Sequence, residues 1–510
     1  MSDAVDRPSF RLGEDHLTVE KALAVTRGEC HAYFSDISLR GIERSKRAID
    51  KILLDKKVVY GINTGFGPLC NQLISPEETS LLQLNILKSH SVGVGNPLPE
   101  KLSKLMLLLK IHALARGFSG VRVETIERIL WHFNHNVIPV VPRQGSVGAS
   151  GDLAPLAHLF LPLIGLGKVH YQGSVIPTKK VLKQFGLPAI KLGPKEGLAL
   201  INGTQFMVAY AIHIVDRLQN CLTHADIIGA MSVEALMGSA QPFREELHRL
   251  RQHPACQIIA RRLRQLLDGS EIMQSHAKCE RVQDPYSLRC IPQVHGASLQ
   301  AWHHLKEITE IEMNSVTDNP IILQNGEALS GGNFHGQPIA LPMDYAALAA
   351  AEIGNISDRR IYLMLEGKNA GLPKLLMRNT GLNSGFMLPQ YTTAALVSEN
   401  KTLCFPASAD SIPTSLGQED HVSMGSISGR KTLRIVKNLE KILAIELLCT
   451  SQAFDFHRPL KSGPILEACH AHIRQHIDHA GKDRVFALDI KKAIHIIRSR
   501  ELIKIYDRIN

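Results

Sequence analysis

The chain has 510 residues, enough for a large buried core and for two structural regions. Hydrophobic residues make up 44% and charged residues 21%, which is typical of a globular protein, and no apolar run is long enough to cross a bilayer. The net charge of +10 is dispersed, with no Lys/Arg block and no interleaved aromatic stripe, which argues against nucleic acid as a partner.

Hydrophobic periodicity predicts a mainly α fold. The predicted helices cover 18–25, 77–90, 99–116, 122–135, 196–224, 295–314, 343–366 and 428–454, with a small hairpin at 167–178. The later helices are apolar over much of their circumference, which indicates a long bundle that also forms a subunit interface. A boundary near residue 200 then separates a loop-rich N-terminal half, 1–200, which carries the catalytic turn, from a bundle and oligomerisation half, 201–510.

Cysteine usage and the first residues bear on the compartment. The nine cysteines have no CxxC spacing and no paired rhythm, which is typical of reduced thiols in a cytosolic protein. The opening segment Met1–Asp6 is acidic and lacks an apolar core, so no signal peptide is expected. The 24 histidines include no HExxH or other close ligand spacing, so no metal site is predicted.

The tripeptide Ala149-Ser150-Gly151 lies in a glycine-rich run, 145–158, and can make an electrophile from its own backbone. The Gly151 nitrogen can attack the Ala149 carbonyl carbon, and loss of two waters, one with the Ser150 hydroxyl, leaves a ring with an exocyclic methylidene. Glycine gives an unhindered nitrogen and a tight turn. Asp152 is expected to cap the next helix and Pro155 to lie in its first turn, directing the positive helix end at the ring. Alone, however, Ala-Ser-Gly is a common tripeptide that is usually not catalytic.

Other polar residues stand in loops, each with a structural alternative. Tyr60 is the first residue of a glycine-rich segment, 60–67, that suits a mobile lid. To act as a base, a tyrosine would need its pKa lowered from about 10. Arg289 follows a proline-turned loop and suits a bidentate grip on a carboxylate, or equally a helix cap. The Gly-rich turn 330–336 carries no phosphate-loop pattern, and Ser150 does not fit the GxSxG elbow of a serine hydrolase.

From about Leu17 to Leu502 the chain resembles the aromatic amino acid ammonia-lyase family. The similarity is carried by segments 60–67, 145–158, 196–205, 283–289 and 330–336. It implies a fumarase/aspartase-like helical fold, a homotetramer with shared active sites, and a 4-methylidene-imidazol-5-one formed autocatalytically from Ala149-Ser150-Gly151 without an external cofactor. It also implies roles for further residues: Tyr60 as the base for the β-proton, Arg289 on the substrate carboxylate, Tyr286 and Gln283 near ring and substrate, Asn202 on the ring oxygen or carboxylate, and Asn333 and Phe334 in the pocket.

Two positions address the choice of amino acid. Ser89-His90 and Glu419 resemble the histidine-specific members, where phenylalanine and tyrosine lyases carry Phe-Leu or His-Leu and Gln. An imidazole offers an N–H that Glu419 accepts and a nitrogen that His90 can serve, whereas a phenyl ring leaves Glu419 buried and unpaired. The implied reaction is non-oxidative deamination of L-histidine to trans-urocanate and ammonium. An aminomutase outcome, a catalytically silent binding relative, and attack by amine or imidazole all stay open.

Overall fold

The computed structural model describes residues 7–277 and 281–509, and its contacts divide the chain into two units. Unit 1 comprises the residues up to 213 with 305–344 and 406–430, and unit 2 comprises 214–304, 345–405 and 431 onward. Both units draw on residues beyond position 200, and the predicted catalytic and oligomerisation halves stay a prediction. No helix in the described ranges is long and apolar enough to cross a membrane.

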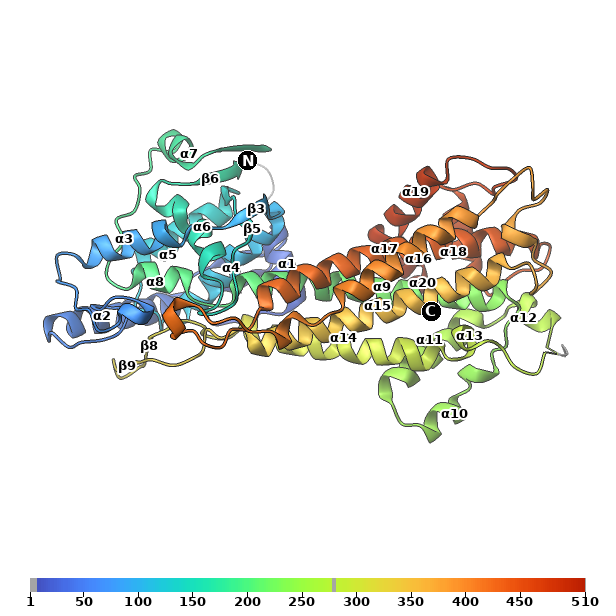
Figure 1. The fold of residues 1–510 in the computed structure, drawn as a ribbon, viewed down its shortest axis with the longest axis horizontal. Helices are drawn as coiled ribbons and strands as arrows, with labels where there is room; N and C mark the ends of the chain where they lie inside the picture. The colour runs from blue at the N-terminus through green and yellow to red at the C-terminus, as the bar shows by residue number, and fades with distance from the viewer. Residues whose placement is uncertain (1–6, 278–280, 510) are drawn as a thin grey trace. The chain divides into compact units, whose positions relative to one another are not determined.

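Unit 1 holds short strands and mostly short helices (Figure 1). The strands are β1 (Ser9–Arg11), β2 (His31–Tyr33), β3 (Val94–Pro97), β4 (Ile138–Pro139), β5 (Pro142–Gln144), β6 (Lys168–Tyr171), β7 (Ser174–Pro177), β8 (Ile321–Ile322) and β9 (Ala328–Leu329). The helices are α1 (Val19–Arg27), α2 (Asp36–Leu54), α3 (Thr79–His90), α4 (Glu100–Ala115), α5 (Val123–Asn134), α6 (Leu153–Phe160), α7 (Thr178–Gln184) and α8 (Glu196–Ile201), with the 3-10 turns η1 (Gly67–Leu69), η2 (Leu161–Ile164), η5 (Ala407–Ala409) and η6 (Ser415–Gly417).

The unit boundary falls within four long helices: α9 (Gln205–Ala235), α14 (Ile291–Met313), α15 (Gln337–Leu365) and α17 (Gly425–Phe456). The remaining elements of unit 2 are η3 (Gln241–Phe243), α10 (Glu245–Leu250), α11 (Pro254–Leu267), α12 (Glu271–Ser275), α13 (Tyr286–Arg289), η4 (Lys374–Leu376), α16 (Met387–Leu403), α18 (Pro464–Arg474), α19 (Phe486–Ser499) and α20 (Glu501–Ile509).

Local chemistry explains the early elements, and the predicted helices before residue 136 are confirmed as α1, α3, α4 and α5. The α1 helix begins at a side-chain cap from Thr18 to the Lys21 N–H and ends at Gly28 in the left-handed region. The predicted hairpin is β6–β7, whose turn residues Gln172 and Gly173 both have positive φ, as the right-handed twist of the strands requires.

One predicted helix, 196–224, is wrong as a single element. The structure has α8 and α9 there, separated by Asn202–Thr204. Asn202 is extended (ψ 135°), and Gly203 has a φ of 122° and pairs with Gly151 in an isolated parallel bridge. The apolar pattern continues across the break because the residues on both sides are buried, so periodicity alone does not reveal it.

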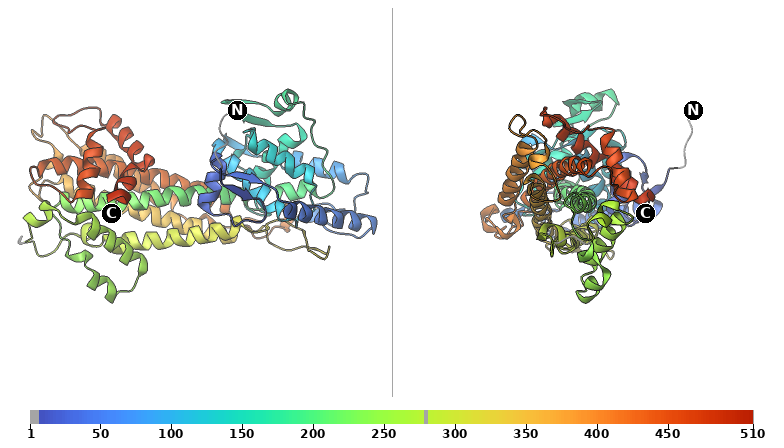
Figure 2. Two further views of the ribbon diagram at one scale, coloured as in Figure 1. Left: turned by 180° about the vertical axis from the view of Figure 1, so that it is seen from behind. Right: turned by 90° about the vertical axis from the view of Figure 1, so that its right-hand side faces the viewer.

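The predicted long bundle is confirmed in unit 2, where α9, α14, α15 and α17 lie side by side (Figures 1 and 2). Arg360 on α15 is fully buried and grips Glu446 on α17 with N···O distances of 2.5 and 3.0 Å, and Ser232 on α9 donates to the same carboxylate at 2.7 Å. Trp302 on α14 donates to the Val215 carbonyl of α9 at 2.9 Å. The core is thus held by apolar packing and by polar groups that satisfy one another.

A buried carboxyl on α9 predicts a pH-dependent stability. Burial raises the pKa of Glu234 from 4.5 to about 7, and the hydroxyls of Ser462 and Ser270 offset this only in part. A carboxyl with a raised folded-state pKa costs stability as pH rises from about 4.5 through 7, because the unfolded chain releases the proton more easily. We expect Glu234→Gln to raise the free energy of unfolding by about 2–3 kcal/mol at pH 8. The gain should shrink steadily toward pH 5 in thermal or urea unfolding, and an equal gain at both pH values would contradict it.

Candidate active site

The Ala149–Gly151 turn lies against the Asn202–Gly203 peptide in unit 1. It follows β5, which pairs with β3, and Gly148 and Gly151 have φ of 70° and 72°. Gly203 accepts the Asp152 N–H at 2.8 Å and donates to the Ser150 carbonyl at 3.4 Å, while Asn202 Nδ2 donates to that carbonyl at 3.0 Å. A Cβ on Gly151 would lie 2.1 Å from the Gly203 carbonyl oxygen, so only glycine fits.

Asp152 plays a different part from the predicted one. It immediately precedes α6, with Pro155 in the first turn as expected, but its side chain does not cap the helix. Instead its carboxylate accepts the Met207 N–H at 3.0 Å and the Ser146 hydroxyl at 3.2 Å. Complete burial raises the pKa of Asp152 to about 7. The carboxyl therefore ties the tripeptide turn to the start of α9.

A cavity of about 830 Å³ in unit 1 gathers residues from distant parts of the chain. Among the predicted site residues it is lined by Tyr60, His90, Ala149, Ser150, Asn202, Phe334 and Glu419. Asn333 does not line it, since its exposed side chain donates to the Val316 carbonyl at 3.3 Å. The cavity is mixed in character, with apolar walls and a few converging polar groups, as is typical of a small-molecule site.

Glu419 is held beside the tripeptide by hydroxyl groups. Its Oε1 accepts the Ser150 hydroxyl at 2.9 Å, and its Oε2 accepts the hydroxyls of Thr414 and Ser415, each at 2.9 Å. Ser415 and Leu416 take φ of 52° and 54°, a strained left-handed conformation for residues with side chains. Thr414 and Ser415 were not predicted as site residues, because no motif marks them and their role depends on this turn.

His90 is the last residue of α3 and lines the same cavity. The Ser89 hydroxyl pairs with its Nδ1 at 3.0 Å. Burial lowers the pKa of His90 below 6.5, more than the Ile86 carbonyl and the Glu419 charge raise it. The imidazole is therefore neutral at neutral pH, with one nitrogen donating and one accepting.

Tyr60 departs from what a base needs. Its hydroxyl oxygen accepts the Gly67 N–H at 3.2 Å, so this hydrogen bond joins the two ends of the glycine-rich segment 60–67. Burial raises the pKa of Tyr60 above 10, the Gly67 hydrogen bond opposes this, and the Glu419 charge adds to it. Tyr60 thus lies at the cavity with its pKa raised rather than lowered, and a nearby cation would favour its action as a base.

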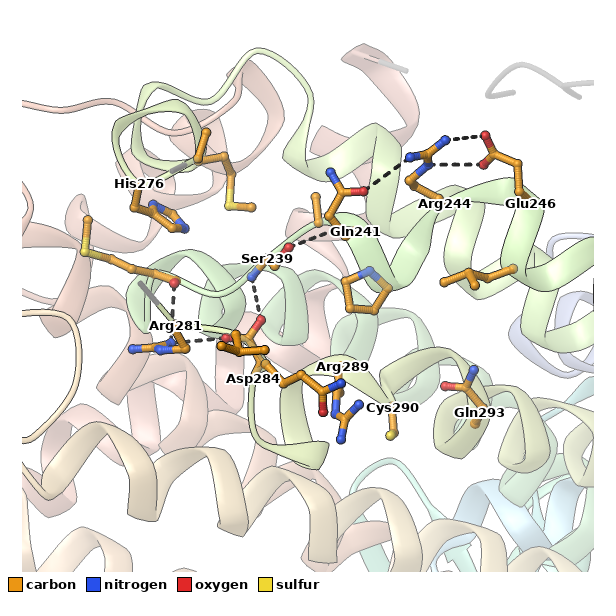
Figure 3. A pocket seen from close by; sticks show the side chains of 18 of the residues that line it. Ser239, Gln241, Arg244, Glu246, His276, Arg281, Asp284, Arg289, Cys290 and Gln293 are labelled. Carbon is orange, nitrogen blue, oxygen red and sulfur yellow. Dashed lines mark hydrogen bonds and ion pairs between the residues drawn. The ribbon is translucent and has the colours of Figure 1, made fainter. Parts of the chain in front are cut away.

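Three predicted residues lie in unit 2 and do not line this cavity. Gln283 and Arg289 line another one, of about 1040 Å³ (Figure 3). The Arg289 guanidinium lies 4.5 Å from the ring centre of Tyr286, which is 70% exposed, and Arg289 Nε is buried without a hydrogen-bond partner in the described structure. Nearby Asp284 is already engaged by Arg281 at 3.1 Å and by the Ser239 N–H at 2.6 Å. Asp284 therefore does not occupy the Arg289 guanidinium, a group that suits bidentate binding of a carboxylate.

The described residues contain no group of three or more His, Cys, Asp or Glu side chains arranged to hold a metal ion. The polar lining of the unit 1 cavity includes the predicted Tyr60, His90, Ser150, Asn202 and Glu419, and also residues that were not predicted, among them Asn319, His335, Asp420 and His421.

Comparison with known proteins gives a consistent result over nearly the whole chain. A sequence model of the family described as aromatic amino acid lyase matches residues 17–475. The chain is 46% identical to a histidine ammonia-lyase of Natranaerobius thermophilus over 493 residues, covering 96% of this chain and 97% of that one. It matches the crystal structure of histidine ammonia-lyase from Trypanosoma cruzi with a TM-score of 0.90 and 40% identity, covering 98% and 95% of the two chains. It also matches tyrosine aminomutase from Streptomyces globisporus, with a TM-score of 0.91, 34% identity and 98% of both chains covered.

Proposed function

Because the chain belongs to the aromatic amino acid lyase family, we propose that it is a histidine ammonia-lyase, which converts L-histidine to trans-urocanate and ammonium. The observation that carries the proposal is the placement of Glu419 and His90 in one cavity with Ala149 and Ser150. The carboxylate accepts the N–H of a substrate imidazole, and the neutral His90 serves its other nitrogen. A phenyl side chain would make neither of these two hydrogen bonds, each worth about 0.5–3 kcal/mol.

The tripeptide fits the prosthetic group that the family uses. The close approach of Gly203 excludes any side chain at Gly151, and Asn202 and Gly203 both donate to the Ser150 carbonyl. We propose that the tripeptide forms 4-methylidene-imidazol-5-one with no external cofactor. The ring supplies an electrophilic carbon, a chemistry that no ordinary side chain offers.

The remaining steps fall to the chain's own side chains. Tyr60 removes the β-proton of the substrate. Asn202 binds the ring oxygen or the substrate carboxylate. Arg289 binds the α-carboxylate through its unpaired donors, with Tyr286 and Gln283 beside it. Phe334 forms part of the cavity wall. Asn333 acts from outside the wall, where its side chain donates to the Val316 carbonyl and fixes the neighbouring turn.

We further propose that complete sites form in a cytoplasmic homotetramer. Within one chain Arg289 and Tyr286 belong to unit 2, while Tyr60 and Ser150 line the unit 1 cavity. Exposed apolar residues along the bundle, such as Leu341, Leu348 and Leu388, support association. A partner's guanidinium would also supply the cation that Tyr60 needs to lose its proton.

Subunit complementation tests the shared site. Ser150→Ala and Arg289→Ala should each be inactive as homotetramers, since each removes one part of every site. After subunit exchange, mixed tetramers should regain activity, because some sites then combine an intact tripeptide with an intact arginine. The measurement is urocanate formation against the mixing ratio, with Ser150→Ala mixed with itself as control. Proven exchange without recovered activity would place both residues in a site from one chain.

The reaction itself is tested with purified protein and L-histidine. The expected result is growth of the trans-urocanate absorbance with one ammonium released per urocanate. L-Phenylalanine and L-tyrosine serve as matched substrates and should give little product. A β-amino acid without free ammonium would instead identify an aminomutase, and no product from any of the three would refute the proposal.

A further inference from the structure

A lysine of unit 1 lies buried beneath the catalytic turn. Lys110, on α4, is 1% exposed, and its Nζ donates to the Asn202 carbonyl at 2.5 Å and to the Ala199 carbonyl at 3.0 Å. These carbonyls end α8, where a cation is stabilised by the helix dipole and by the unpaired backbone acceptors. Lys110 therefore anchors the peptide that runs from α8 into Asn202–Gly203.

The anchored peptide is the one that compresses the tripeptide. Asn202 and Gly203 donate to the Ser150 carbonyl, and Gly203 accepts the Asp152 N–H. The Gly203 carbonyl is also the group that a Cβ on Gly151 would meet at 2.1 Å. The Asn202 carbonyl carbon is bonded to the Gly203 nitrogen. A displacement of Lys110 would therefore displace Gly203, whose carbonyl lies close to Gly151.

The electrostatic surroundings set Lys110 apart from its neighbour Lys195. Lys195 is equally buried but pairs with Asp318 at 2.6 Å and donates to the Ser119 carbonyl at 2.9 Å. Lys110 donates both of its hydrogen bonds to backbone carbonyls. Burial lowers the pKa of Lys110 to about 7, although the negative charges of Asp318 and Asp152 raise it in part. Keeping so costly a group in this place indicates a task beyond simple pairing.

We propose that Lys110 is a positioning residue for ring closure, which it promotes by fixing the Asn202–Gly203 peptide against Ala149-Ser150-Gly151. The inference rests on the proposed function, since it concerns formation of that ring. The Gly151 nitrogen bonds to the Ala149 carbonyl carbon, whose oxygen leaves as water with the protons of the Gly151 and Ser150 nitrogens. The Ser150 hydroxyl then leaves as a second water with the Ser150 Cα proton. No oxidant or co-reactant is required.

The test measures the mass of folded protein rather than its activity. Lys110→Met keeps the length of the side chain but removes the donors, and Lys110→Arg keeps them. Intact-mass analysis of the folded fraction soon after synthesis should show the parent chain lacking two waters. In Lys110→Met the ratio of dehydrated to unmodified chains should fall about ten-fold to a hundred-fold, and Lys110→Arg should restore most of it.

A matched control separates positioning from general stability. The variant Lys104→Met removes another lysine of α4, whose Nζ donates to Asn136 Oδ1 at 2.6 Å and not to the Asn202–Gly203 peptide, and it should dehydrate as the parent does. Full dehydration of Lys110→Met, or an equal loss in Lys104→Met, would overturn the proposal. If Lys110→Met does not fold, Lys110→Leu, which also lacks a donor, is measured by the same criterion; failure of both to fold would make Lys110 a folding residue and also overturn it. A parent chain that never loses two waters would refute the ring itself, which is a different result.

Discussion

Ser150→Ala is expected to lower kcat by about 10³-fold or more while leaving the fold intact. The hydroxyl is the group that must leave when the ring forms, so the variant cannot complete it. Its only hydrogen bond as a donor in the described structure goes to Glu419, which keeps Thr414 and Ser415 as partners. Urocanate kinetics together with the thermal unfolding midpoint measure the two halves of this expectation.

Ser103→Ala is the matched control for that variant. Ser103 is buried in α4 of the same unit, and its hydroxyl has no partner among the described residues, so its removal should change neither activity nor stability by much. A Ser150→Ala enzyme with near-parental kcat would remove the tripeptide from the mechanism. A large fall in both variants would instead point to a folding defect in unit 1.

The second large effect concerns substrate choice. The triple variant Ser89→Phe, His90→Leu and Glu419→Gln removes the partners of the imidazole and adds apolar surface. Hydrogen bonds that involve a charged group contribute about 1.5–3 kcal/mol, so losing both imidazole contacts should lower kcat/KM for L-histidine by about 10³-fold. L-Phenylalanine should become at best a poor substrate, because Thr414 and Ser415 still line Glu419's position with hydroxyls.

Ser89→Ala separates the positioning of His90 from the contact that His90 makes with the substrate imidazole. It removes only the hydroxyl that pairs with His90 Nδ1 and should have a much smaller effect than the triple variant. Unchanged kinetics for L-histidine in the triple variant would show that these residues do not contact the substrate side chain, and the histidine assignment would lose its structural support.

Much of the architecture follows from patterns that the chain displays locally. Helical spacing of apolar residues located α1, α3, α4 and α5, and the hairpin turn at Gln172–Gly173 follows from its glycine. The helix 196–224 was wrong because its break at Asn202–Gly203 is created by a distant partner, Gly151. The apolar periodicity does not show such a break when the flanking residues remain apolar, and the Asn202-Gly203 dipeptide, which is typical of turns, was the available local sign.

The same limit explains which site residues were missed. The chemistry of the tripeptide pointed to Ser150, and the family resemblance pointed to Tyr60, Asn202 and Glu419; the structure gathers all four around one cavity. Lys110 lies instead within an apolar stretch of α4, where a single lysine is normally read as a solvent-facing residue of the helix. A charge enclosed by Leu107–Leu109 and Ile111 was the available sign, since a helix buried on all sides leaves such a residue no route to water.

Peptide mapping of active enzyme tests the central claim most directly. The fragment that contains residues 145–152 should be lighter than its sequence mass by two waters, and fragmentation should confine the loss to Ala149-Ser150-Gly151. The same preparation must convert L-histidine to trans-urocanate, so that the mass is read on working enzyme. An unmodified tripeptide in fully active protein would contradict the account.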